Sequence, residues 1–246
     1  MRTFIIIFLL LFFTSSTKAD TIYNLIKIPN LKIYEINTKN KIKYFYASGG
    51  FRLGVEKNIE CFSSDIKSLS SKFKIIHNNL SQYSSNFLKK INLKYIVMCE
   101  NLSISGISTA GIPNNLMKTL IIDIKFNKNY FERSIHHEIF HIINDNFSDI
   151  FDEEVWKSLN KKEFKYAECS TCTDKINLAT YNKTEGFFTE YSKSTASEDM
   201  AEVFSYLMFN KSIVKEKIIN DIILKKKVSF LKKNILKIDS KFKFDD

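Results

Sequence analysis

Glycine and proline are scarce in this chain, with 6 Gly and 2 Pro among 246 residues. The sequence also has no internal repeat and no Pro/Gly/Ser-rich linker. Beyond the first 19 residues, no segment comes near the run of about 20 apolar residues that a membrane-spanning helix needs. These absences argue against a repeat protein, a linked pair of domains and an integral membrane protein. Apolar residues make up 44% of the chain, enough to predict one sizeable core over residues 20–246.

Acidic residues are outnumbered, with 27 Asp and Glu against 37 Lys and Arg, which gives a formal charge of +10. The excess is mostly lysine, spread along the chain, and no stripe of arginine interleaved with aromatic residues is present. That pattern favours a solvated lysine surface over a nucleic-acid-binding face. We therefore predict no nucleic-acid partner, while weak attraction to an anionic membrane surface stays open.

The first 19 residues are typical of a secretory signal peptide. Arg2 supplies a positive start, residues 4–13 form an unbroken apolar run of ten, and Thr17 and Ala19 suit a cleavage site. The run is too short to span a bilayer, and no cysteine follows it to carry a lipid. A buried N-terminal strand is the alternative. We predict an exported protein, periplasmic or secreted, with no stable membrane anchor after cleavage.

Hydrophobic periodicity predicts a mixture of strands and helices. Short strands are expected over residues 21–60, and buried strands over Leu93–Cys99 and Leu120–Phe126. Between these two strands, Ser105–Asn115 has the glycines and proline of a loop. Helices are expected in Ser64–Ile91, Tyr130–Asn144 and Ser197–Phe209, with Ser197 as the cap of the last, and one or two surface helices in Ile213–Ile238. Residues 145–196 lack periodicity, which is typical of a functional or locally structured connection.

Four cysteines follow the leader, Cys61, Cys99, Cys169 and Cys172. An even number in an oxidising compartment favours disulfides, and three pairings are possible. Cys61–Cys99 with Cys169–Cys172 is the simplest. The Cys-x-x-Cys pair has two alternatives, redox activity and metal binding, but the thioredoxin-like setting and the further zinc ligands that these need are not evident. We predict a structural clip of the loop.

Three of the four histidines lie within six residues of each other, in His136-His137-Glu138-Ile139-Phe140-His141. On a helix, His137 and His141 are four residues apart and project from one face, where two imidazoles can take adjacent corners of a zinc tetrahedron. Glu138 lies close to the open corner and can take a proton from a zinc-bound water, whose pKa falls toward about 7. We predict one Zn²⁺ per chain. His136 faces about 100° away and is expected to pack or line the cleft, and His77 to be structural or exposed.

A third ligand is expected from a separate element. Glu198 and Glu202 are also four residues apart, so both carboxylates lie on one helix face. One of them can bind the metal while the other accepts the second ring N–H of a ligating histidine. Ala201 between them permits close approach of the histidine helix. The alternative is a solvated acidic helix start, favoured by the helix dipole.

The two motifs, His137-Glu138-x-x-His141 and Glu198-Asp199-Met200-Ala201-Glu202, resemble those of the gluzincin peptidases, and of the catalytic domain of the anthrax lethal factor group in particular. The resemblance covers roughly residues 120–210. It implies a zincin-like α+β fold, with a small mixed sheet packed on the active-site helix and a C-terminal helical subdomain. It also implies that Glu198 is the third ligand, and that Glu202 is the carboxylate that accepts a ring N–H from a ligating histidine.

In that group a tyrosine seven residues before the ligand glutamate stabilises the transition state, and Tyr191 stands at that position here. The resemblance therefore implies that Tyr191 donates a hydrogen bond to the oxyanion. By analogy of topology, the strand Leu120–Phe126 would pair with an extended substrate. The resemblance does not identify a substrate.

These observations predict an exported zinc-dependent endopeptidase that acts on protein or peptide substrates. His137, His141 and Glu198 bind zinc, Glu138 is the general base and Tyr191 stabilises the oxyanion. Two alternatives stay open. One is a catalytically silent zinc-binding effector or binding protein on a peptidase scaffold, which the presence of Glu138 disfavours; the other is a hydrolase of a non-peptide bond.

Overall fold

Strand β5 (Tyr95–Ile104) is the centre of the sheet in the computed structural model, which describes residues 28–174, 176–181 and 184–244. Its first half lies between two parallel neighbours, β2 (Lys43–Ala47) and β8 (Thr119–Asp123). Antiparallel strands complete this part, β1 (Leu31–Glu35) beside β2 and β7 (Gly111–Asn114) beside β8. The predicted signal segment, residues 1–19, lies outside the described residues.

The second half of β5 joins a smaller antiparallel part. It pairs with β4 (Ile59–Phe62) and with the short β6 (Ile107–Ser108), and β3 (Phe51–Leu53) lies beyond β4, after which comes the 3₁₀ turn η1 (Val55–Lys57). One long strand therefore serves both parts, and the sheet curls along it.

Side chains alternate between the two faces of the central strands, so the core is divided into two parts, one on each face of the sheet. In β5, Ile96 and Met98 join the large core under the helices, while Val97 and Cys99 join a smaller core on the opposite face. All five residues of β8 are buried. Near-continuous apolar strands are expected where parallel strands are covered on both faces.

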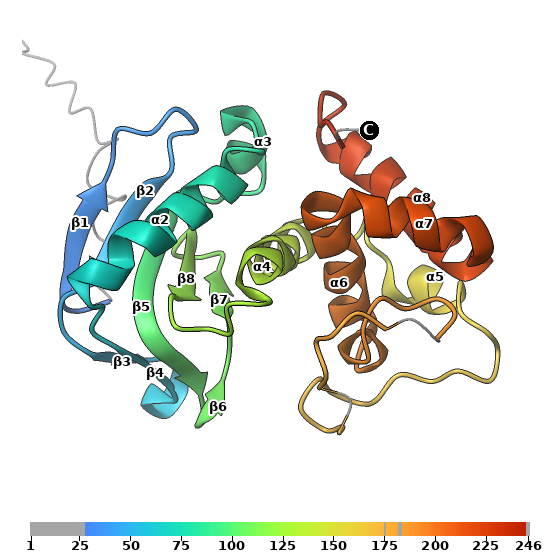
Figure 1. Ribbon diagram of the computed structural model, residues 1–246, viewed down its shortest axis with the longest axis horizontal. Helices are drawn as coiled ribbons and strands as arrows, with labels where there is room; N and C mark the ends of the chain where they lie inside the picture. Colours follow the sequence, from blue (N-terminus) through green and yellow to red (C-terminus); the bar gives the residue numbers. More distant parts are fainter. Residues whose placement is uncertain (1–27, 175, 182–183, 245–246) are drawn as a thin grey trace, which may run out of the picture.

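Helices α2 (Ile66–Leu80) and α3 (Ser85–Lys90) follow β4 and contribute to the large core. Asp65 caps α2 by accepting hydrogen bonds from the N–H groups of Lys67 and Ser68, and Ser84 caps α3. Figure 1 shows α2 crossing one face of the sheet. The helices predicted over Ser64–Ile91 are confirmed.

Helix α4 (Phe131–Asn146) lies between the sheet and the C-terminal helices (Figure 1). It contacts β7, β8 and α2 on one side and α6 (Ala196–Phe209) on the other. Almost every residue from Ile135 to Ile143 is buried, because both sides of the helix are covered. Helix α6 also contacts α5 (Glu153–Lys157), the 3₁₀ turn η2 (Tyr191–Lys193), α7 (Lys211–Asn220) and α8 (Ile222–Ile238).

The α+β class predicted from the sequence is confirmed, but two local predictions were wrong. Ser105–Asn115 is not a plain loop, because it forms β6 and β7. Helix α6 begins at Ala196 rather than Ser197, and Thr195 caps it. The one or two surface helices predicted over Ile213–Ile238 are confirmed as α7 and α8, although Lys227 of α8 is fully buried. Within the described residues, no helix is both long and apolar enough to cross a bilayer.

Both predicted disulfides are present. Cys61–Cys99 links the neighbouring strands β4 and β5, and Cys169–Cys172 closes a short loop between α5 and η2. The connection from 145 to 196 carries this clip, α5, η2 and an isolated bridge between Thr180 and Thr189. It is locally structured, as predicted.

Candidate metal centre

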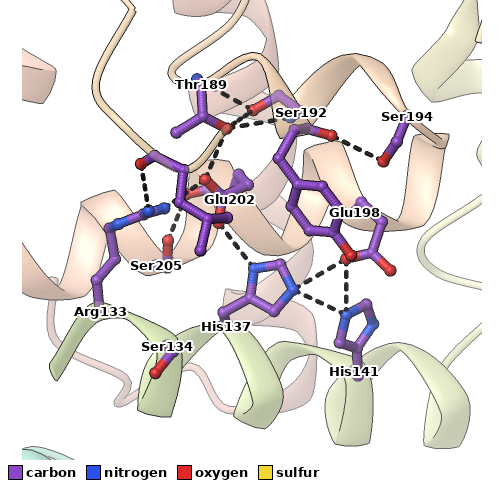
Figure 2. A network of polar contacts seen from close by, with 12 residues as sticks. Arg133, Ser134, His137, His141, Thr189, Ser192, Ser194, Glu198, Glu202 and Ser205 are labelled. Atoms are coloured by element: carbon purple, nitrogen blue, oxygen red, sulfur yellow. Dashed lines mark hydrogen bonds and ion pairs between the residues drawn. The ribbon is translucent and has the colours of Figure 1, made fainter. Parts of the chain in front are cut away.

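The three predicted ligands come together between α4 and α6 (Figure 2). His137 Nε2 lies 2.9 Å from Glu198 Oε2, and His141 Nε2 lies 3.2 Å from the same oxygen. The two Nε2 atoms are 3.1 Å apart. In a tetrahedral site with ligands about 2.0–2.1 Å from zinc, ligand atoms lie about 3.3 Å from one another. The triangle of side chains therefore has the size and the donor set that zinc requires.

The protonation pattern also requires a positive centre in this triangle. His137 Nδ1 is 2.9 Å from Glu202 Oε1, so this nitrogen donates its N–H to that carboxylate. In a neutral His137, Nε2 then carries a lone pair that faces Glu198 Oε2, and two acceptors repel at 2.9 Å. Either a proton or a metal ion between them resolves the repulsion.

The same conflict determines the pKa of His137 in the metal-free protein. Burial opposes protonation of its ring, but the hydrogen bonds and charges of Glu198 and Glu202 outweigh burial and raise the pKa to about 10. Although burial disfavours its charge, the nearby histidines hold the pKa of Glu198 well below its usual range. A centre that attracts a proton this strongly also suits a divalent cation.

Helix geometry positions each ligand. Thr195 Oγ1 accepts a hydrogen bond from the backbone N–H of Glu198 at 3.2 Å, which fixes the first turn of α6. Ser197, predicted to be the cap, lies inside the helix, where its Oγ is 3.4 Å from His141 Nδ1. Ala201 is fully buried, as expected where two helices approach closely.

Glu138 lies next to this triangle in a buried position, 8% exposed. Burial raises its pKa to about 7, and the partial offset comes from His137 and His141. Strand β7 passes directly over it, since a Cβ on Gly111 would lie 2.8 Å from Glu138 Cγ and 3.1 Å from the carbonyl oxygen of Ile121. Glycine at 111 is thus required for the strand to pack against this carboxylate.

A cavity of about 290 Å³ opens beside His137 and Glu138. Tyr191 lines it, and its ring centroid is 6.0 Å from that of His137. Burial, the charges of Glu198 and Glu138, and a hydrogen bond with Glu198 raise the pKa of Tyr191. Its hydroxyl therefore stays protonated and can donate a hydrogen bond. The other walls come from β6 and the residues before β7, from the start of α4 and the residue before it, and from the clipped loop and the chain after it. They include Ile107, Ala110, Tyr130, Thr171 and Ile176.

Glu202 lies behind His137 rather than in the triangle. It is 1% exposed, and its Oε2 accepts hydrogen bonds from Arg133 and, at 2.8 Å, from Thr189 Oγ1. Burial disfavours its charge, but Arg133 and His137 lower its pKa to about 2. The sequence did not single out Arg133, although its position four residues before His137 was a readable signal.

The other two histidines are structural. His136 is fully buried, with Nδ1 2.6 Å from the Tyr83 hydroxyl and Nε2 2.9 Å from Asn79 Oδ1, and burial lowers its pKa to about 3. It packs rather than lining the cavity. His77 is half-buried, contacts the Tyr44 hydroxyl and stacks on Phe73.

The strand predicted to pair with substrate cannot do so. Strand β8 ends at Asp123 and is hydrogen-bonded on both sides, to β5 and β7. In the described part of the chain, β7 has β8 as its only partner, so β7 is the edge strand next to Glu138. Pro113 within β7 agrees with an edge position, since proline has no N–H to give a second neighbour.

Fold and site together define an α+β protein with a candidate metal centre of two histidines and one glutamate. Comparison with known families gives the more particular assignment. The chain belongs to the family described as "putative zinc-binding metallo-peptidase", whose sequence profile matches residues 80–244. No curated protein matches the chain.

A solved structure shares the fold. It is a crystal structure of a "putative zinc-binding metallo-peptidase" from Bacteroides caccae, 17% identical in sequence, with a TM-score of 0.51. The match covers 91% of this chain and 87% of that one. Neither comparison tests the resemblance to gluzincins and to the lethal factor group, which stays a prediction.

Proposed function

We propose that this protein is an exported zinc-dependent endopeptidase with a zincin-like, gluzincin-type site. The observation that carries the proposal is the convergence of His137 Nε2, His141 Nε2 and Glu198 Oε2 within 3.2 Å of one another, beside a cavity that Glu138 and Tyr191 line. Membership of a family of zinc-binding peptidases supports zinc as the metal and peptides as the substrate. Two disulfides support an oxidising compartment, and hence export.

The proposed roles follow from these positions. His137, His141 and Glu198 hold the metal, and zinc, when bound, supplies Lewis-acid polarisation of a water molecule and of a peptide carbonyl. Glu138 takes the proton from the water and passes it to the leaving amine. Tyr191 donates a hydrogen bond to the oxyanion, and Glu202 orients His137. The edge of β7 would align an extended peptide by main-chain hydrogen bonds.

The decisive experiment separates metal binding from cleavage. Glu138→Gln is expected to retain one zinc per chain and to lose cleavage of a peptide library by a factor of about 10²–10⁴, because general-base catalysis contributes that much. Glu198→Ala is expected to lose zinc, and Glu202→Ala to retain one zinc per chain with weaker affinity. Glu163→Gln is the matched control, because Glu163 is exposed on the connection after α5.

Three outcomes would overturn the proposal. Cleavage that survives Glu138→Gln would show that Glu138 is not the general base. If zinc is lost in Glu202→Ala but kept in Glu198→Ala, the roles of the two glutamates are reversed, and Glu202 is the third ligand. A wild-type protein that binds zinc but cleaves no peptide would instead be the zinc-binding effector or binding protein considered above.

A further inference from the structure

Arg133 extends the face of α4 that carries the two histidines. Arg133, His137 and His141 recur every four residues, so their side chains point to α6 from three successive turns. Glu198 and Glu202 face them from α6. The contacts alternate between the helices, from Arg133 to Glu202, then His137, Glu198 and His141, as Figure 2 shows.

The guanidinium group of Arg133 is held rigidly. Its side chain is 5% exposed, Nη1 donates to Glu202 Oε2, and Nη2 donates to the carbonyl oxygen of Leu178 at 2.8 Å. The guanidinium carbon lies 4.8 Å from the ring centroid of Tyr206. A planar group with two fixed bonds and an aromatic contact has little freedom to turn.

Arg133 determines which oxygen of Glu202 faces the metal centre. Oε2 is occupied by Arg133 and Thr189, so Oε1 is left for His137 Nδ1 at 2.9 Å. Among the described residues, Arg133 is the one permanent cation that pairs with Glu202. Without it, Glu202 would carry a buried charge balanced only by the ring that it must orient.

We propose that Arg133 is a positioning residue for the metal centre, acting through Glu202 on His137. By fixing and neutralising the Glu202 carboxylate, it sets the ring orientation of His137 and the strength with which Nε2 binds the metal. Partners behind a ligating histidine typically change metal affinity by 10–100-fold. The inference rests on the proposed function, because it takes His137 to be a zinc ligand.

The test is a double-mutant cycle on zinc affinity, measured by competition with a chromogenic chelator. Arg133→Met is expected to weaken zinc binding about 10–100-fold. Adding Arg133→Met to Glu202→Gln is expected to weaken it by less than about twofold further, because the arginine acts through the glutamate. Arg133→Lys keeps the charge and should restore affinity to within about tenfold of the wild type. Arg52→Met is the matched control, since Arg52 pairs with Glu60 on the surface, with its side chain 63% exposed.

Circular dichroism and thermal unfolding of each metal-free variant show whether it is folded. If Arg133→Met does not fold, the cycle is run with Arg133→Lys, whose loss of affinity should likewise disappear in the Glu202→Gln background. Wild-type zinc affinity in folded Arg133→Met would overturn the proposal, as would losses that multiply in the double variant. A wild-type protein that binds no zinc would instead refute the proposed function itself.

Discussion

Two buried charge clusters lie on different sides of α6, although the residues that begin them are neighbours in sequence. Glu198 points to α4 and the histidines, whereas Asp199 points to α8 and Lys227. In the second cluster, Asp199 Oδ2 accepts hydrogen bonds from Lys227 Nζ and Tyr166 Oη, both at 2.6 Å, and from Trp156 Nε1 at 2.9 Å. Asp199 and Lys227 are both 0% exposed.

The two clusters differ in how their charges are balanced. Around Asp199 every hydrogen bond goes from a donor to Oδ2, and the lysine and the carboxylate neutralise each other, although Oδ1 is buried without a hydrogen-bond partner. Around Glu198, three lone-pair atoms converge without a fixed donor among them, beside a cavity. Burial of charge therefore does not identify a functional site. The signs are a convergence of acceptors that needs a proton or a metal ion, together with access for a ligand, and of these two clusters only the one at Glu198 has both.

The largest effect is expected from removing Lys227, the cation of the cluster around Asp199, which we call the closed cluster because both charged side chains are fully buried. Lys227→Met leaves the carboxylate of Asp199 buried without its charge partner, which should lower the free energy of unfolding by about 3–5 kcal/mol. Urea unfolding of the metal-free protein measures this loss. Lys226→Met, an exposed neighbour on α8, is the control and should change stability by less than about 0.5 kcal/mol. A loss as small as the control's would mean that the closed cluster is not structural.

The next effect concerns two half-buried tyrosines, Tyr191 beside Glu198 and Tyr166 beside Asp199. Tyr191→Phe removes the proposed oxyanion donor, so kcat should fall about 10²–10³-fold while zinc affinity stays unchanged. Tyr166→Phe removes a hydrogen bond to Asp199, which should lower stability by about 1–2 kcal/mol and leave kcat unchanged. Peptide cleavage and urea unfolding of both variants test the contrast. Equal effects on kcat would contradict the division of roles.

The third effect is a pH dependence that only the metal-free protein should show. The folded pKa of His137 is raised from 6.5 to about 10, so its proton stabilises the fold fully below pH 6.5, and this contribution is lost as the pH rises toward 10. Between these two pH values the free energy of unfolding should fall by up to about 1.4 kcal/mol per pH unit, because the folded state holds one proton that the unfolded state has released. Urea unfolding with chelator and with zinc tests it, because lysine titration affects both forms alike. The same pH dependence in both forms would show that no metal replaces the proton.

The smallest effect is expected when both charges of the closed cluster are removed together. Asp199→Asn combined with Lys227→Met leaves no unpaired charge, and the amide oxygen can still accept from Trp156 and Tyr166. The double variant should unfold within about 1–2 kcal/mol of the wild type and be more stable than Lys227→Met alone. A stability equal to or below that of the single variant would show that the ion pair itself is needed.

The sequence predicted the candidate metal centre better than its surroundings. His137 and His141, like Glu198 and Glu202, are pairs whose spacing on one helix already places them on one face. Tyr191 came from a resemblance, since nothing in its local sequence distinguishes it from the other tyrosines. Arg133 was missed because an arginine in a polar helix start usually lies on the surface. Strand β7 was missed because Gly111, which β7 needs to pass over Glu138, resembles loop punctuation.

By itself, the sequence determined the features that depend on near neighbours along the chain. These are the α+β class, the helices that carry the histidines and glutamates, and the short Cys169–Cys172 clip. Tertiary structure decided that Glu198 lies with His137 and His141 while Glu202 contacts the far side of His137, and that Asp199 turns away to Lys227. The reason is physical. Periodicity fixes the face of a helix on which a side chain lies, but only the packing of α4, α6 and α8 decides what that face meets.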